Sequence, residues 1–231
     1  MFLERVIIIQ KSRQSILLSI VMMSIIVIYM TPSEHYLMKS FFRLVPMVIF
    51  LYYAALQMPT KKRPVHFLVL IGFVFSLSGD AVYYWPVLEF ILAPAAILNG
   101  YLFYSIGFLT QIRFSLMRFL SIIPIGLFGF MIIYVLFQEL EQSGTEFLIF
   151  FIFVYALFAI GMCWTAFLTG NKWAKASALL FVISDTIRSL SLIYQKDSFD
   201  LLVILTYFGA QLLIAHSLGT FFRKNKKVYP K

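Results

Sequence analysis

The chain has 231 residues, of which 61% are hydrophobic and only 13% are charged, and its formal net charge is +9. A soluble globular domain is about half apolar and about a quarter charged, so this composition excludes an ordinary water-soluble domain and indicates a protein embedded in lipid. The basic residues fall in short clusters between apolar runs. They form no basic face long enough to follow a phosphate backbone, so nucleic acid is not an expected partner.

Eight apolar runs are each long enough, or nearly so, to cross a bilayer, whose hydrocarbon core needs about 20 residues of helix. Strands of a membrane barrel would instead alternate in polarity every second residue. We therefore predict an all-α membrane protein, a polytopic bundle of eight transmembrane helices that forms a single domain over residues 1–231. In chain order the predicted helices are Ser15–Met30, Tyr36–Gln57, Val65–Tyr84, Pro86–Thr110, Arg118–Phe137, Glu146–Thr169, Trp173–Tyr194 and Leu201–Phe222.

Charges in the connections between these runs predict the orientation of the chain. Most lysines and arginines lie on the face that carries the N-terminus, and Lys196 is the only basic residue in the opposite connections. Because basic connections stay in the cytoplasm, the pattern predicts that both termini are inside. The acidic residues of the opposite face are Glu34, Glu89, Glu139, Glu141, Glu146, Asp197 and Asp200.

Lys39 lies near the start of the second predicted helix, where a lysine can reach the membrane surface. Four charged residues remain deeper inside the predicted membrane helices: Arg43, Asp80, Asp185 and Arg188. A charge at the centre of a bilayer costs at least about 2.5–3.5 kcal/mol, so such residues usually face the protein interior and have a partner. Counted along their helices, these four fall at similar depth in the outer half of the membrane. We therefore expect one polar pocket that opens toward the outer face.

Side chains three or four residues apart share one face of a helix, which extends this pocket. Asp80 and Asp185 are the candidate catalytic residues. The candidate substrate-binding residues are polar side chains at comparable depth: Arg43, Tyr83, Asn99, Arg188, Tyr207 and Gln211.

Two carboxylates in one apolar pocket do not ionise equally well. One keeps its proton while the other is stabilised by an arginine, and such a pair can donate a proton to a substrate and take one from water. The same pair suits a proton-coupled transporter, and a non-catalytic lipid-binding protein could use the aspartates as buried partners of the arginines. These three alternatives stay open at this point.

Other common catalytic arrangements are missing from the sequence. Cys163 is the single cysteine, and the three histidines show no spacing typical of metal ligands, so neither a metal nor another cofactor is expected. There is no Gly-x-Ser-x-Gly elbow and no phosphate-binding glycine loop. A hydrolase with this sequence would have to use its carboxylates.

The two aspartate segments resemble the YhhN family of lysoplasmalogenases. The run from Phe75 to Asp80 resembles the Phe-Ser-x-x-Gly-Asp motif of this family, and the run from Ala178 to Asp185 resembles its second aspartate motif. The segment 207–214 resembles its last helix. The resemblance implies an eight-helix enzyme that cleaves the vinyl ether bond of lysoplasmalogens to a fatty aldehyde and a glycerophospho-alcohol.

The same resemblance implies that Asp80 and Asp185 are the essential residues and that the partners are a lysophospholipid substrate and membrane lipid. The expected membrane is the cytoplasmic one in a bacterium and the endoplasmic reticulum in a eukaryote, and the oligomeric state is left open. One departure concerns the fourth helix, where Phe108 and Gln111 stand at positions expected to hold a histidine and a tyrosine. This departure puts in doubt either the headgroup preference or the substrate altogether.

Similar short runs precede the two aspartates, on helices that run in the same direction. They start at Phe75 before Asp80 and at Phe181 before Asp185. Duplication of a four-helix unit and chance in so apolar a sequence explain this similarity about equally well.

Overall fold

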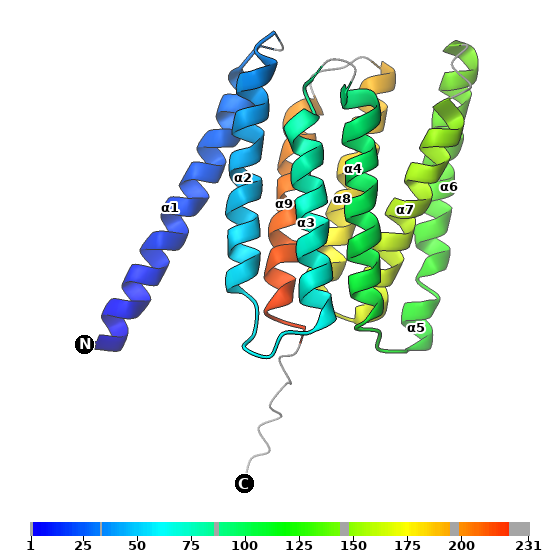
Figure 1. The fold of residues 1–231 in the computed structure, drawn as a ribbon. Coiled ribbons are helices and arrows are strands. Elements are labelled where there is room, and N and C mark those ends of the chain that lie inside the picture. Colours follow the sequence, from blue (N-terminus) through cyan, green and yellow to red (C-terminus); the bar gives the residue numbers. More distant parts are fainter. Residues whose placement is uncertain (1, 33, 86–87, 144–147, 195–198, 222–231) are drawn as a thin grey trace.

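The computed structural model describes residues 2–32, 34–85, 88–143, 148–194 and 199–221, and this part of the chain is almost entirely helical (Figure 1). It contains eight long helices, which run up and down the bundle, and one short helix. They are α1 (Phe2–Met30), α2 (Tyr36–Leu56), α3 (Pro64–Val82), α4 (Leu88–Leu109), α5 (Leu116–Phe119), α6 (Ile122–Ser143), α7 (Leu148–Thr169), α8 (Lys172–Tyr194) and α9 (Asp200–Leu218).

The predicted helices correspond to the observed ones with three differences. Helix α6 ends at Ser143, six residues beyond the predicted end at Phe137. Helix α1 begins at Phe2, well before the predicted start at Ser15. The fifth predicted helix is divided, since α5 ends at Phe119 and α6 begins at Ile122. This second start places Pro124 in the first turn of α6, where a missing backbone N–H breaks no helical hydrogen bond. The predicted ends at Pro86, Glu146 and Phe222 lie outside the described residues.

Six of the helices are long and apolar enough to cross a membrane, which supports a membrane-embedded protein: α2, α3, α9 and the segments Ile91–Leu109, Leu116–Glu141 and Phe150–Thr169. Helix α8 has 23 residues but carries Asp185 and Arg188 and is not among these six. The apolar segment Ser15–Met30 of α1 is shorter. The count of eight spans and the inside location of the termini therefore stay predictions.

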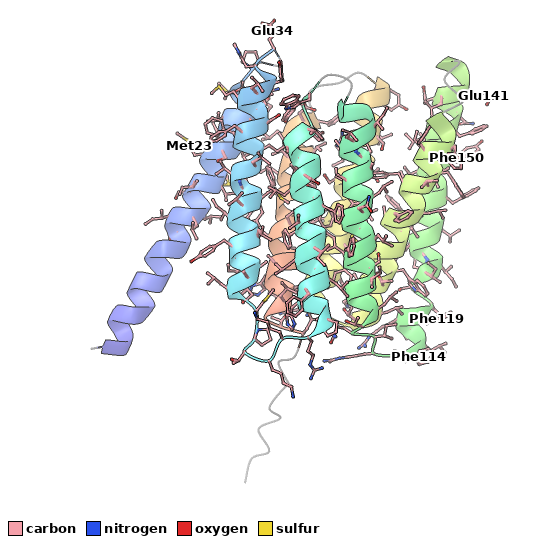
Figure 2. All side chains as sticks on the ribbon, in the orientation of Figure 1. Met23, Glu34, Phe114, Phe119, Glu141 and Phe150 are labelled. Carbon is pink, nitrogen blue, oxygen red and sulfur yellow. The ribbon has the colours of Figure 1, made fainter. Side chains whose placement is uncertain are left out.

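Large apolar side chains cover the outside of the bundle, as lipid contact requires. Met23 is 62% exposed and Phe150 is 68% exposed, and both project outward from the helices (Figure 2). In the same view Glu34 and Glu141 lie toward one end of the bundle, and Phe114 and Phe119 lie toward the other. In water this surface would be a large exposed apolar patch, whereas in lipid it is simply solvated.

Six helices form a closed ring within the described part of the chain. Around the ring, α2 packs on α3, α3 on α4, α4 on α7, α7 on α8, α8 on α9, and α9 returns to α2. Helix α1 packs outside the ring on α2, and α6 packs outside it on α7. The units α1–α4 and α6–α9 thus occupy equivalent places, and the structure supports the internal repeat that the sequence left open.

Small residues set the two tightest helix pairs at matching positions. Gly72 and Gly79 lie eight and one residues before Asp80, and both face α4. Ser177 and Ser184 lie eight and one residues before Asp185. Their hydroxyls donate to the backbone carbonyls of residues 210 and 203 on α9, at 2.8 and 3.0 Å. Small residues allow close helix contact in lipid, where no hydrophobic force draws helices together.

Replacing Gly72 with alanine is expected to destabilise the ring. An added Cβ would overlap the ring of Tyr104 and come within 3.1 Å of the carbonyl oxygen of Gly100. Overpacking of this kind costs about 1–3 kcal/mol, so the thermal unfolding midpoint of the purified protein in detergent should fall. Gly126→Ala is the matched control, because nothing lies within 4 Å of a Cβ there. Equal midpoints for the two variants would contradict the proposed role of Gly72 in packing.

Candidate functional site

Asp80 is held inside the ring by an ion pair and a phenol. The Arg43 Nε of α2 donates to Asp80 Oδ1 at 2.5 Å, and the Tyr207 hydroxyl of α9 donates to Asp80 Oδ2 at 2.8 Å. Arg43 is 2% exposed and Asp80 is fully buried. A charge-assisted hydrogen bond of this type is about twice as strong as a neutral one. Three helices are therefore joined at one carboxylate.

A line of hydrogen bonds leads from α3 and α4 to the same carboxylate. The Tyr104 hydroxyl donates to Gln211 Oε1 at 3.0 Å, and Gln211 Nε2 donates to the Tyr207 hydroxyl at 3.3 Å. The Ser76 hydroxyl lies 3.4 Å from the Tyr104 hydroxyl. Tyr104, Gln211 and Tyr207 each donate to the next group in this line, so every donor is directed toward Asp80. Such chains strengthen one another in a low-dielectric interior.

Tyr83 lies between two guanidinium groups. Arg43 Cζ is 3.6 Å from the centre of the Tyr83 ring, and Arg188 Cζ of α8 is 4.1 Å from it. The negative face of an aromatic ring attracts cations, more strongly away from water. Arg43 has Asp80 as an ion-pair partner, whereas Arg188 makes no ion pair or hydrogen bond with any described residue.

Asp185 is held by two phenols and by no cation within hydrogen-bond distance among the described residues. The Tyr101 hydroxyl of α4 donates to Asp185 Oδ2 at 2.7 Å, and the Tyr155 hydroxyl of α7 donates to Oδ1 at 3.0 Å. Asp185 itself is half-buried. Tyr101 is fully buried and lies edge-on to Tyr155, with ring centres 6.0 Å apart.

The two carboxylates are neighbours rather than members of one hydrogen-bonded group. Phe181, one turn before Asp185 on α8, packs against Tyr101 and Tyr207 with ring centres 5.4 and 5.9 Å apart. The charge of Arg188 interacts with both Asp80 and Asp185. The expected single pocket is thus two adjoining clusters, separated by an aromatic side chain and linked through Arg188.

Five of the six predicted substrate-binding residues lie at these clusters: Arg43, Tyr83, Arg188, Tyr207 and Gln211. Asn99 is the exception. Its side chain is exposed on α4, and its amide donates to the carbonyl of Ala95 at 2.9 Å. Depth in the helix was therefore a poor guide, because Asn99 occupies a different face of α4 from Tyr101 and Tyr104.

Sequence reasoning missed the direct partners of Asp185. Tyr101 and Tyr104 are three residues apart, the spacing that places side chains on one helix face. This spacing could have drawn attention to both, whereas the residues three and four positions from Tyr155 are all apolar. Phe108 and Gln111, the positions of the family departure, lie four and seven residues beyond Tyr104. Phe108 packs on Phe221, with ring centres 6.1 Å apart.

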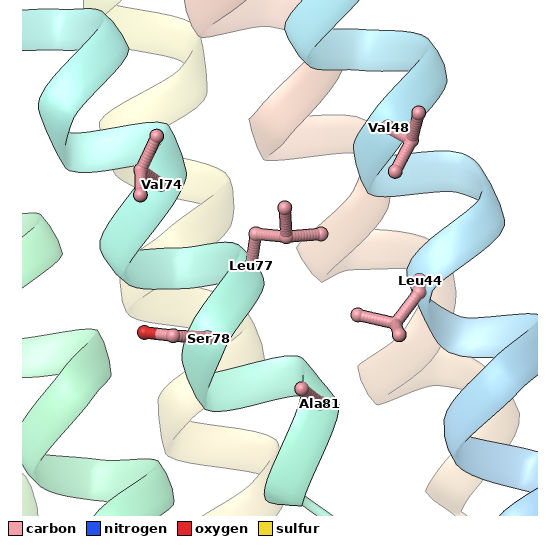
Figure 3. Close-up of a pocket in the computed structure, with 6 residues that line it drawn as sticks. All are labelled: Leu44, Val48, Val74, Leu77, Ser78 and Ala81. Carbon is pink, nitrogen blue, oxygen red and sulfur yellow. The ribbon is translucent and has the colours of Figure 1, made fainter.

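A groove between α2 and α3 lies beside the clusters and has different chemistry (Figure 3). It has a volume of about 340 Å³ and its lining residues are Leu44, Val48, Val74, Leu77, Ser78 and Ala81. The Ser78 hydroxyl donates to the carbonyl of Phe75 at 2.7 Å. The groove therefore offers apolar contact only, and the reactive groups belong to the interior of the ring. The described residues contain no group of three or more potential metal ligands.

A comparison with known families shows to which family the chain belongs. The model of the YhhN family matches residues 38–218, which span the ring helices almost from end to end. The chain belongs to the YhhN family. No curated protein and no solved structure matches it. Membership in the YhhN family confirms the resemblance seen at the two aspartate motifs and supports a hydrolase, while the bond that it cleaves is a matter for proposal.

The Arg43–Asp80 pair of this YhhN protein is expected to show the asymmetry typical of buried ion pairs. Arg43→Met should cost about 3–5 kcal/mol, because it leaves the Asp80 carboxylate buried without its cation. The double variant Arg43→Met with Asp80→Leu should recover most of that loss, since no charge is then buried unpaired. Thermal unfolding in detergent measures both. A double variant less stable than either single variant would contradict this account.

Proposed function

We propose that the protein hydrolyses the vinyl ether bond of a lysoplasmalogen to a fatty aldehyde and a glycerophospho-alcohol, with Asp80 and Asp185 as its acid–base pair. The observation that carries this proposal is the placement of the two carboxylates. Each lies inside the ring and receives hydrogen bonds from two other helices. Side chains held in this way are positioned for proton transfer before a substrate arrives.

The reaction needs one proton donor and one proton acceptor. A carboxylic acid protonates the outer carbon of the vinyl ether, which leaves an oxocarbenium ion. Water then adds to the carbon that bears the oxygen, and the other carboxylate takes its proton. The resulting hemiacetal breaks its bond to the glycerol oxygen and releases the aldehyde and the alcohol. No other reactant is required, so two carboxylates and water suffice.

Two alternatives explain less of the geometry. A purely structural role accounts for the Arg43–Asp80 pair. It does not explain why Asp185 is inside the ring, since no described cation forms an ion pair with it. A transporter of this size would be expected to carry helices broken at the binding site. The helices that bear the carboxylates and their hydrogen-bond partners run without a break through these positions.

We assign the phosphate of the lysolipid to Arg188. Its guanidinium has no ion-pair partner among the described residues and is only half-buried, whereas Arg43 already pairs with Asp80. Guanidinium groups bind phosphate through paired, charge-assisted hydrogen bonds. Tyr83 holds Arg188 beside the carboxylates through its ring face. Tyr207 and Gln211 act through Asp80, and Asn99 is left out because it lies on another face of α4.

The purified protein in detergent is expected to release fatty aldehyde from a lysoplasmalogen. Asp80→Asn and Asp185→Asn should each lower the rate about 10²–10⁴-fold, the usual contribution of a general acid or base. Glu139→Gln neutralises a carboxylate outside the ring and serves as the matched control. Aldehyde release is measured directly, and the fold of each variant is checked by its unfolding midpoint.

Two results would contradict this proposal. One is a folded wild-type protein that releases no aldehyde from lysoplasmalogens with several headgroups. The other is full activity in a folded variant that lacks either carboxylate.

Arg188→Gln is expected to raise KM for a phosphate-bearing lysoplasmalogen about 10–100-fold, because hydrogen bonds to charged groups are worth about 1.5–3 kcal/mol. The KM for an alkenylglycerol without phosphate should stay the same. Lys175→Gln removes a positive charge near the other end of α8 and is the control. Equal effects on both substrates would show that Arg188 does not bind the phosphate.

A further inference from the structure

The two carboxylates occupy equivalent places in the internal repeat. Asp80 stands on α3 and Asp185 on α8, the third helix of each unit when α5 is left aside. Each accepts one bond from the helix before its own, Arg43 of α2 or Tyr155 of α7. Each also accepts one bond from the last helix of the other unit. Tyr207 of α9 thus serves Asp80, and Tyr101 of α4 serves Asp185.

The two clusters therefore differ in their direct partners at one place, where one holds a guanidinium and the other a phenol. A guanidinium is always charged and only donates hydrogen bonds, so its partner Asp80 is stabilised as a carboxylate. A phenol is neutral and can either donate to a carboxylate or accept from a carboxylic acid. The partners of Asp185 thus tolerate both of its protonation states, whereas Arg43 favours only the ionised state of Asp80.

The hydrogen bonds beyond the direct partners reinforce this difference. The Tyr104 hydroxyl donates to Gln211, and the Gln211 amide donates to the Tyr207 hydroxyl. The Tyr207 hydroxyl in turn donates its proton to Asp80. A protonated Asp80 would place a donor where Arg43 and Tyr207 already supply donors. Asp80 is therefore at the accepting end of the network.

The remaining polar and charged groups do not offset the contrast. The charge of Arg188 acts on both aspartates, and Arg188 donates a hydrogen bond to neither of them. The groups that face Asp80 are Arg43, Tyr104, Arg188 and Tyr207, and Tyr83 and Tyr84 face its partner Arg43. The groups that face Asp185 are Tyr101, Tyr155 and Arg188.

From these contacts we infer that Asp185 is the general acid of the reaction and that Asp80 is the ionised base. The inference rests on the proposed function. The Asp185 carboxylic acid gives its proton to the vinyl ether carbon and becomes a carboxylate. Asp80 takes a proton from the attacking water as the new carbon–oxygen bond forms.

Collapse of the hemiacetal restores both groups. The bond between the carbon and the glycerol oxygen breaks, and Asp80 returns its proton to that oxygen. The hemiacetal hydroxyl passes its proton to Asp185 as the aldehyde forms. Both aspartates end in their starting protonation states, and the net reaction consumes one water molecule.

Two tyrosines at equivalent places provide a matched test that changes no charge. Tyr101→Phe removes a donor from Asp185, and Tyr207→Phe removes a donor from Asp80. Loss of a donor makes the carboxylate easier to protonate. A rate that needs a protonated acid falls on the basic side of the pH profile, and a rate that needs an ionised base falls on the acidic side.

The experiment compares the pH dependence of kcat/KM in the wild type and both variants. Tyr101→Phe is expected to move the basic limb to higher pH by about one unit, and Tyr207→Phe to move only the acidic limb to higher pH by about one unit. Tyr155→Phe should repeat the effect of Tyr101→Phe. The opposite pattern, with Tyr207→Phe moving the basic limb, would overturn the assignment while aldehyde release still upheld the function.

A second measurement needs no activity. Infrared spectra of the wild type at neutral pH should contain the C=O stretch of a protonated carboxyl group. That band should vanish in Asp185→Asn and persist in Asp80→Asn. Loss of the band in Asp80→Asn instead would overturn the assignment. If the wild type released no aldehyde yet showed the expected band, the proposed reaction would fail while the difference between the two carboxyl groups stood.

Discussion

The buried ion pair between Arg43 and Asp80 is the constraint on which the ring depends. Two charges at this depth are costly to remove from water, and the cost is offset only if both are fully paired. The Asp80 carboxylate therefore draws on donors from two other helices, α2 and α9. The contact closes the ring between the first helices of the chain and the last, which have no short connection to hold them together.

Charge made part of the site predictable from the sequence. Arg43, Asp80, Asp185 and Arg188 stand out because a charged residue in a membrane segment is rare, and all four lie at the two clusters. Tyrosine carries no such signal in this chain, which has 13 tyrosines and 26 phenylalanines. The spacing of Tyr101 and Tyr104 marks one helix face, but the contacts of Tyr101 and Tyr155 with Asp185 could be recognised only once their helices were placed. The prediction placed Asn99 in the pocket because it is polar, but the sequence did not show which face of its helix it occupies.

The fold, like the site, was predictable from the sequence only in part. Apolar length predicted where helices occur, because a bilayer imposes that length on every span. It did not predict the break between α5 and α6, which depends on one short connection near Pro124. Nor did it predict which helices meet. In lipid, neighbours are selected by small residues and hydrogen bonds, and the decisive positions are Gly72 and Gly79 on α3 and Ser177 and Ser184 on α8.

The equivalence of α1–α4 and α6–α9 has a consequence for how two unlike carboxyl groups can share one ring. If the ring were assembled from two separate and identical polypeptides, every substitution would appear twice, and both carboxylates would face the same partner. Continuity of the chain through α5 removes that symmetry. One half then holds an arginine while the other holds a tyrosine at the corresponding contact, so a single chain can place two chemically distinct aspartates in one ring.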